Sequence, residues 1–347
     1  MYEARELIID PEFQRMFRWS EGAQSRFIES LLLELPVPPI FLIEREDRVY
    51  ELIDGLQRIS SYLHFRGILK IDDELQSPLT LADCDIVTEL NGLAAQNLPR
   101  ALDIKLKRSY TRAEILRKES DPRLRYYMFK RLNTGGEVLS EQEIRNATIR
   151  LLDNTFNAFL MRLSTNTDFQ SCIGLISDNQ RKRRFDQELV LRFFAFKNKR
   201  DWYRHDVADF LTDYMEAVSD PTDHTVDFDY TIEEAIFTKT FAVLRRAATV
   251  GATPLGDRLF GSVVPGGGGP RGQFSIYHYE GITLGLQSIL GNIDVKDEEF
   301  LSRVGTLISQ GKADPAFLRH TGAGKNDPNP LRERIEYFSN RFSQLLS

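Results

Sequence analysis

Cysteine, histidine and long apolar runs are scarce in this sequence of 347 residues. The two cysteines, Cys84 and Cys172, stand far apart and have no metal-ligand spacing, so we predict that both are buried small hydrophobic residues. No apolar run approaches the roughly 20 residues that a membrane-spanning helix needs. The N-terminal stretch MYEARELIID is acidic and lacks the apolar segment of a signal peptide. We therefore expect a soluble, cytoplasmic protein without a membrane partner.

An excess of positive charge is also missing. The chain carries 45 Lys and Arg against 51 Asp and Glu, a formal net charge of −6. This balance argues against a protein that coats DNA through its overall field, so contact with nucleic acid would need a local basic surface. With 41% hydrophobic and 28% charged residues the sequence is typical of a globular protein, and its length favours two packed domains over one.

The first part of the chain alternates short apolar runs with amphipathic stretches, which is typical of an α/β domain. A short strand is expected around Leu7, and Ser20 is placed to cap a helix. The run PIFLIERE predicts a strand that begins after three prolines, and RVYELID predicts its hairpin partner. We predict an α+β fold, with an α/β domain over residues 1–150 and a mostly helical domain over residues 151–347.

In the second part the apolar residues recur every three or four positions, which indicates a helical bundle. The predicted helices cover residues 151–163, 185–198, 207–218, 231–248 and 331–346. The stretch GSVVPGGGGPRGQ, residues 261–273, is expected to be irregular because consecutive glycines lose much entropy on ordering. A mobile tip is favoured over a phosphate-binding loop there, since no Lys-Ser or Lys-Thr follows the glycines.

The stretch YELIDGLQRISSYLHF, residues 50–65, changes from a strand pattern to a helix pattern in its middle. Gly55 permits a positive φ at this turn, and Arg58 offers a planar fork for two phosphate oxygens. Asp54 can hold a metal, accept from a ribose or base, or activate water. Gln57, Ser60 and Ser61 complete the polar set, the two serines as hydroxyl donors. The alternative is ordinary turn chemistry with a salt-bridged arginine.

Two further stretches carry similar chemistry. FQRMFRWSEGAQ, residues 13–24, brings Gln14, Arg15, Arg18 and Trp19 before a helix, a set that can bind phosphate and stack on a base, or form an edge with Trp19 in the core. YYMFKRLNTGGEVLSEQEIRNA, residues 126–147, ends one predicted helix at Asn133. It begins another with Ser140 as N-cap and Glu143 as its capping-box partner.

The three stretches together resemble the N-terminal domain family of GmrSD-type restriction endonucleases, domain-of-unknown-function family 262. The family's motifs appear as Phe13-Gln14-Arg15 with Trp19, as Ile53-Asp54-Gly55-Leu56-Gln57-Arg58, and as Phe129-Lys130-Arg131-Leu132-Asn133 with Ser140. The resemblance covers about residues 5–150 and implies a ParB/sulfiredoxin-like fold whose Gly-x-x-Arg element grips nucleotide phosphates. It also implies hydrolysis of a nucleoside triphosphate in defence against phage, with Mg²⁺ as a candidate cofactor.

The turn and its neighbouring stretches supply two sets of candidate residues. Catalytic roles are predicted for Asp54, Gln57 and Arg58. Nucleotide contacts are predicted for Gln14, Arg15, Arg18, Gly55, Arg58, Ser60, Ser61 and Asn133. The sequence identifies neither the base nor a metal ligand set.

The chain departs from the family pattern in two places. Leu56 stands where relatives carry a glutamine, so a hydrogen bond from that amide is lost, and hydrolysis is less well supported than binding. It also excludes sulfiredoxin-type redox chemistry, which needs a cysteine in that position. Many relatives continue into a His-Asn-His nuclease domain, whereas the five histidines here are scattered.

A basic segment, residues 181–205, holds nine Lys or Arg and three Asp or Glu, a local balance of 9 − 3 = +6. We predict phosphate contacts of nucleic acid at its two ends, and the alternative is a pair of solvated loops. The candidate residues are Arg181, Lys182, Arg183, Arg184, Lys199 and Arg200.

Three functions follow as hypotheses. The first is a nucleotide-binding and nucleotide-hydrolysing module of a DNA-targeting defence system. The second is a ParB-like nuclease that acts on DNA directly. The third is a non-catalytic sensor that binds nucleotide or DNA and recruits a separately encoded nuclease or defence subunit.

Overall fold

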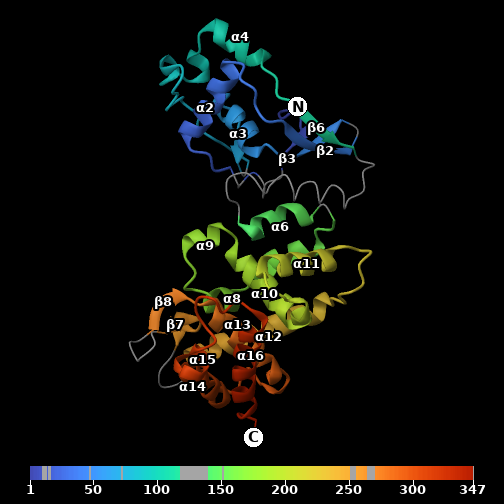
Figure 1. Ribbon diagram of the computed structural model, residues 1–347, viewed down its shortest axis with the longest axis vertical. Coiled ribbons are helices and arrows are strands. Elements are labelled where there is room, and N and C mark those ends of the chain that lie inside the picture. Colours follow the sequence, from blue (N-terminus) through green and yellow to red (C-terminus); the bar gives the residue numbers. More distant parts are fainter. Residues whose placement is uncertain are drawn as a thin grey trace. The chain divides into compact units, whose positions relative to one another are not determined.

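The computed structural model describes residues 1–9, 14, 17–46, 48–71, 73–117, 140–150, 152–250, 255–263 and 270–346. The chain divides into two compact units, Met1–Leu139 and Ser140–Ser347 (Figure 1). The predicted boundary lies later, at residue 150. Helix α6 (Glu141–Ile149) falls within the second unit because it packs on helices of that unit, α10 (Phe185–Lys199) and α11 (Val207–Ser219).

Within the described part of the first unit, the main sheet has four strands in the order β1-β3-β2-β6. Their bounds are β1 Leu7–Ile8, β2 Ile40–Glu46, β3 Val49–Asp54 and β6 Ala113–Leu116. Strands β2 and β3 pair antiparallel, which confirms the predicted hairpin, while β1 runs parallel to β3 and β6 parallel to β2. The sheet is therefore mixed. It places the end of β3 beside the start of β2, and the start of β6 lies on the other side of β2.

Two helices of this unit, α2 (Glu21–Leu32) and α3 (Leu56–Phe65), pack against each other. As predicted, the hydroxyl of Ser20 caps α2, accepting a 3.3 Å hydrogen bond from the backbone N–H of Ala23. Apolar side chains of both helices join a core with residues from the following loops and from α4 (Arg100–Arg108). The remaining elements are β4 Lys70–Ile71, β5 Glu74–Leu75 and the 3₁₀ turns η1 Thr88–Leu90 and η2 Ala95–Asn97.

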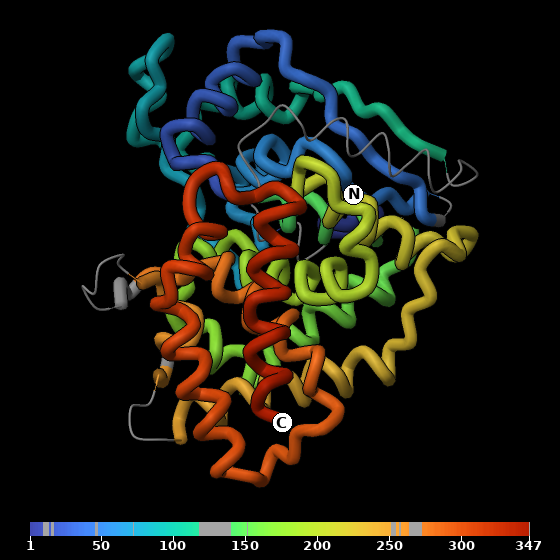
Figure 2. Tube along the Cα trace, turned by 60° about the horizontal axis from the view of Figure 1, so that its bottom comes forward, coloured from blue at the N-terminus to red at the C-terminus, as the bar shows by residue number. Residues whose placement is uncertain are grey.

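The described part of the second unit is mostly helical, as predicted. Besides α6, α10 and α11, its helices are α7 Thr155–Ser164, α8 Thr167–Cys172, α9 Asp178–Lys182, α12 Tyr230–Thr249, α13 Ile276–Gly285, α14 Glu298–Ala313, α15 Pro315–Leu318 and α16 Pro328–Ser343. Short 3₁₀ turns are η4 Arg200–Trp202, η5 Gly256–Arg258, η6 Leu286–Ser288 and η7 Leu290–Asn292. The C-terminal helix α16 packs along α13 (Figure 2).

Helix α6 begins with the predicted capping box. The Ser140 hydroxyl accepts a hydrogen bond from the backbone N–H of Glu143, and the Glu143 carboxylate accepts one from the backbone N–H of Ser140. The Ser140 hydroxyl also donates to the backbone carbonyl of Arg183 at 2.7 Å. The first residue of the second unit is thereby bonded to the turn before α10.

The glycine-rich stretch differs from its prediction. Residues Gly261–Val263 form strand β7 and Pro270–Phe274 form strand β8, and the two pair antiparallel. Regular backbone hydrogen bonding thus continues on both sides of residues 264–269, which lie outside the described residues. The local composition does not predict this pairing, because it joins residues on either side of the glycines.

Both cysteines are buried, as predicted. Burial raises the pKa of the Cys84 thiol to about 11, and burial also raises the pKa of Cys172. Both side chains are therefore neutral thiols that pack as small apolar groups. Within the described ranges, no helix has the length and apolar character needed to span a membrane.

Candidate functional site

The strand-to-helix turn is built around Gly55. Strand β3 ends at Asp54, and Gly55 is the N-cap of α3 with φ 100° and ψ 16°. A Cβ atom at this position would lie 2.5 Å from Cγ2 of Ile40 on the neighbouring strand. Both the positive φ and this close approach require glycine. The first turn of α3 has no side-chain cap, so the site keeps helix N–H groups that no cap side chain satisfies.

Arg58 returns from the first turn of α3 to the end of β3. Its Nη2 atom donates to Oδ2 of Asp54 at 2.8 Å and to the carbonyl oxygen of Pro39 at 3.0 Å. The side chains of Arg58 and Asp54 are 17% and 27% exposed. Arg58 Nε is buried and makes no hydrogen bond to a described residue. The guanidinium is therefore held at the turn while part of its donor capacity is unused.

Gln57 connects this turn to the second predicted cluster. Its side-chain oxygen Oε1 accepts hydrogen bonds from the backbone N–H groups of Arg18 and Trp19, each at 3.0 Å. The structure thus brings residues 18–19 to the first turn of α3, as expected if the two stretches form one site. Arg18 has an exposed side chain, whereas Trp19 packs edge-on against Phe27 with the ring centroids 5.9 Å apart. Trp19 is therefore part of the core edge.

Other predicted residues do not reach the open side of the turn. The Gln14 side chain is buried, and its Nε2 donates to the carbonyl oxygen of Lys70. Ser60 and Ser61 are completely buried, and the Ser61 hydroxyl donates to the carbonyl of Gln57 at 2.6 Å. These positions follow from helix geometry, because residues two and three places after Arg58 turn toward the core face of α3. Arg15 and Asn133 lie outside the described residues.

Leu56 also belongs to the core, with 5% of its surface exposed. In the family that the sequence resembles, this position carries an amide that can hydrogen-bond to a ligand. In this chain the side chain points inward, which makes the leucine a packing residue of the turn.

The charged side chains of the turn are one carboxylate, Asp54, and one guanidinium, Arg58. Within the described ranges no group of three His, Cys, Asp or Glu side chains is placed to hold a metal ion. Asp54 is the single carboxylate that β3 and the first turn of α3 supply at this end. One carboxylate together with phosphate oxygens of a ligand is a common way for proteins to hold Mg²⁺, so the residues fit that ion only in company with a phosphate ligand.

Helix α10 separates the two ends of the basic segment, residues 181–205. Its 15 residues hold these ends about 21 Å apart. Between them, Arg192 is paired with Glu188 and Glu280, and Lys197 with Glu233, so these two cations serve the interior. Lys182, Arg183 and Arg200 are exposed, and the Lys199 ammonium lies 5.2 Å from the Trp202 ring. Arg181 and Arg184 are half-buried. The contact with nucleic acid predicted for the two ends of this segment stays a prediction.

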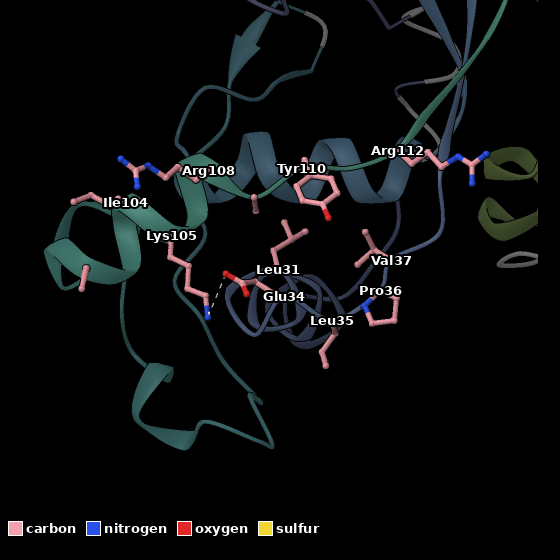
Figure 3. Close-up of a pocket in the computed structure, with 12 residues that line it drawn as sticks. Leu31, Glu34, Leu35, Pro36, Val37, Ile104, Lys105, Arg108, Tyr110 and Arg112 are labelled. Atoms are coloured by element: carbon pink, nitrogen blue, oxygen red, sulfur yellow. Dashed lines mark ion pairs between the residues drawn. The ribbon is translucent and has the colours of Figure 1, made fainter.

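One feature of the first unit has no counterpart among the sequence-based predictions. A groove of about 720 Å³ lies between the C-terminal end of α2 and helix α4 (Figure 3). The signal in the sequence is RSYTR, residues 108–112, where Tyr110 stands between Arg108 and Arg112 just before strand β6. This segment contains no apolar periodicity, so a search for helix and strand patterns does not single it out.

Comparison with known proteins identifies the first part of the chain. Neither a search of curated proteins nor a search of solved structures found a match. Residues 1–150 match the family model described as GmrSD restriction endonuclease, N-terminal domain. The match covers the turn at Gly55, the segment that Gln57 holds, and the capping box at Ser140. The match indicates a component of a restriction or defence system. Residues 1–150 therefore belong to the N-terminal domain family of GmrSD restriction endonucleases.

Proposed function

We propose that the first unit binds a nucleoside triphosphate at the turn formed by Asp54, Gly55 and Arg58, as part of a prokaryotic restriction system. The observation that carries this proposal is the state of Arg58. Its Nη2 atom is anchored by Asp54 and Pro39, but its buried Nε has no hydrogen-bond partner among the described residues. An unpaired buried donor costs roughly 1–3 kcal/mol. A phosphate oxygen would recover part of this cost once a shift of the Arg58 side chain exposed Nε, which is closed to solvent in the structure.

The backbone adds to this preference for an anion. Gly55 lets the chain approach without a side chain, and the uncapped N–H groups of the first turn of α3 point out of the helix end. The partial positive charge of the helix N-terminus acts in the same direction as the guanidinium. Together they favour a ligand that carries several negative charges, as a triphosphate does.

Hydrolysis needs a group that orients or activates water, and Asp54 is the candidate at this turn. When bound with phosphate, Mg²⁺ would neutralise charge on the phosphate oxygens, and Asp54 would be its protein ligand. Gln57 has less freedom for such a role, because its side-chain oxygen already accepts two backbone hydrogen bonds. We assign Gln57 the task of holding residues 18–19 against the turn.

The same observation about Gln57 supports a second candidate function. If neither Gln57 nor Leu56 orients a water molecule, the unit binds nucleotide without rapid turnover and acts as a sensor for a separate nuclease. The two functions share the binding site and differ only in hydrolysis, so release of inorganic phosphate separates them.

The test is the affinity of the full chain for ATP, GTP, CTP and UTP by calorimetry, with Mg²⁺ and with EDTA. Arg58→Ala should weaken binding about 12- to 140-fold, which corresponds to roughly 1.5–3 kcal/mol for hydrogen bonds to a charged group. Asp54→Asn should remove the gain in affinity that Mg²⁺ gives, while leaving binding in EDTA equal or tighter, because the competing carboxylate is gone.

Arg66→Ala is the matched control. Arg66 lies at the other end of α3 and pairs with Asp103 at 3.0 Å with similar exposure, so the same helix loses the same kind of ion pair. This variant should bind nucleotide as the unchanged protein does. Equal affinities of the Arg58→Ala variant and the unchanged protein, or no binding of any of the four nucleotides, would contradict the proposal.

A further inference from the structure

The groove beside α4 has an apolar floor and a cationic rim (Figure 3). Leu31 and Val37 lie at the floor, and Leu35 and Ile104 are exposed at its sides. Its volume of about 720 Å³ exceeds what one aromatic ring of a ligand occupies. A surface of this kind removes flat apolar groups from water while cations remain at the edge.

Tyr110 is the most exposed large hydrophobic residue among those that the structure describes, with 90% of its surface open to solvent. Its backbone is nevertheless held on both sides. The N–H and the hydroxyl of Ser109 both donate to the carbonyl of Leu106, and the N–H of Ile40 donates to the carbonyl of Arg112 at 2.9 Å. An exposed ring on a fixed backbone is well suited to stack on a flat ligand, because little backbone entropy is lost on binding.

The charge around the ring is positive. Residues 100–112 contain five Lys or Arg and one Asp, a balance of 5 − 1 = +4 in a chain whose net charge is −6. The acid, Asp103, is already paired with Arg66 and Lys107. Two carboxylates outside the segment, Glu34 beside Lys105 and Glu114 beside Arg112, reduce the local balance to 5 − 3 = +2, which is still positive.

Three of these cations line the groove. Arg108 is exposed and makes no ion pair with a described residue. Arg112 is exposed and forms an ion pair with Glu114 at 2.7 Å, and Lys105 pairs with Glu34 at 3.7 Å at the rim. In Figure 3 the Tyr110 ring lies above Leu31, with Arg108 and Arg112 directed away on either side. The ring is thus placed between two guanidinium groups along an extended backbone.

We propose that this groove binds single-stranded nucleic acid, with a base stacked on Tyr110 and phosphates near Arg108 and Arg112. A cationic track with an interleaved exposed aromatic is the arrangement that single strands require, because each nucleotide offers both a flat π-face and a negative charge. A duplex keeps its bases stacked inside and would use the cations alone. An acidic peptide would likewise leave the Tyr110 ring without a stacking partner.

The test of this groove contains no triphosphate, so its outcome does not depend on whether the turn at Gly55 binds nucleotide. Fluorescence anisotropy with the full chain would measure the affinity for a labelled 20-nucleotide thymidine strand, an abasic strand of the same length and a 20-base-pair duplex. The thymidine strand should bind most tightly. Tyr110→Ala should weaken its binding about 5- to 140-fold, Tyr110→Phe should keep it, and the abasic strand should be insensitive to both changes.

The cations are tested with a matched pair on the same helix. Arg108→Ala should weaken binding and reduce the salt dependence, log K against log salt, by about 0.7 for each phosphate that the arginine no longer neutralises. Arg100→Ala removes the same charge from an exposed arginine of α4 that does not line the groove, and it should change binding less. Equal effects of the two variants would indicate general attraction to a basic surface and would overturn the assignment of the groove.

Three other results would overturn the proposal. One is unchanged binding of the thymidine strand by the Tyr110→Ala variant, with its circular dichroism spectrum preserved. Another is tighter binding of the duplex than of the single strand. The third is that poly-glutamate, at the same concentration of charge, displaces the labelled strand as effectively as the unlabelled strand does. That result would assign the groove to an acidic peptide.

Discussion

Replacement of Gly55 by alanine tests the construction of the turn more directly than any change to its polar residues. The φ of 100° costs an alanine roughly 1–3 kcal/mol. The new Cβ would lie 2.5 Å from Ile40 Cγ2, at least about 1 Å closer than a normal contact between carbon atoms. Overpacking of this kind costs about 1–3 kcal/mol when the neighbour must move. We expect Gly55→Ala to lower the free energy of unfolding by about 2–6 kcal/mol, the sum of the two costs.

Gly92 provides the comparison within the same unit. It also has a positive φ, 84°, but a Cβ there would meet nothing within 4 Å. Gly92→Ala should therefore cost only the backbone part, about 1–3 kcal/mol. The difference between the two variants isolates the contact with Ile40.

The assay is urea unfolding followed by circular dichroism, supported by hydrogen exchange of the α3 amides, which reports the first unit separately. A double-mutant cycle with Ile40→Ala removes Cγ2, so the alanine at position 55 should be less costly in that background. If Gly55→Ala and Gly92→Ala destabilise the protein equally, and the cycle shows no coupling, then the close approach of β2 to the turn is wrong.

Two further predictions concern single side chains. Leu56→Gln should lower the free energy of unfolding by about 2–4 kcal/mol, because a buried leucine is lost and an amide is buried. Triphosphate turnover should not rise. A stable variant with faster phosphate release would show that the side chain at position 56 reaches the nucleotide and is not part of the core. Burial lowers the pKa of Lys312 to about 8 from 10.5, so between these values the unfolded chain holds a proton that the folded protein lacks. Stability should therefore rise with pH across this window, by about 3 kcal/mol from this group. The difference in stability between the unchanged protein and Lys312→Met, measured by urea unfolding across this window, should show this rise. The unchanged protein alone does not isolate it, because the raised pKa values of the buried thiols Cys84 and Cys172 lower stability as pH rises in the same window.

The elements that the sequence predicted correctly are those with local causes. The Ser20 cap, the Ser140–Glu143 capping box and the β2–β3 hairpin each depend on residues a few positions apart. The Asp54–Arg58 ion pair also joins residues only four positions apart, and it corresponds to the salt-bridged arginine predicted as the alternative to a phosphate ligand. Such interactions appear in the sequence as fixed spacings, so they can be recognised without a structure.

The features that could not be predicted depend on contacts between distant residues. The side-chain oxygen of Gln57 accepts hydrogen bonds from two backbone N–H groups that lie 38 and 39 residues away in the sequence. No pattern near Gln57 indicates that its oxygen makes these bonds. The basic segment of residues 181–205 counts as +6 along the chain, yet Arg192 is paired with Glu280, which lies 88 residues away. Charge along a sequence therefore overstates charge on a surface wherever a helix turns part of the segment inward.

The bond from Arg58 to the carbonyl of Pro39 has a consequence for communication within the first unit. Pro39 closes the loop whose earlier residues, Pro36 and Val37, line the groove beside α4. A ligand that drew the guanidinium away from this carbonyl would release one restraint on that loop, and a ligand seated in the groove would oppose or assist the release. Because thermodynamic coupling is reciprocal, each ligand would change the affinity of the other by the same factor. The hydrogen bond of a single arginine would then make the turn and the groove parts of one allosteric unit.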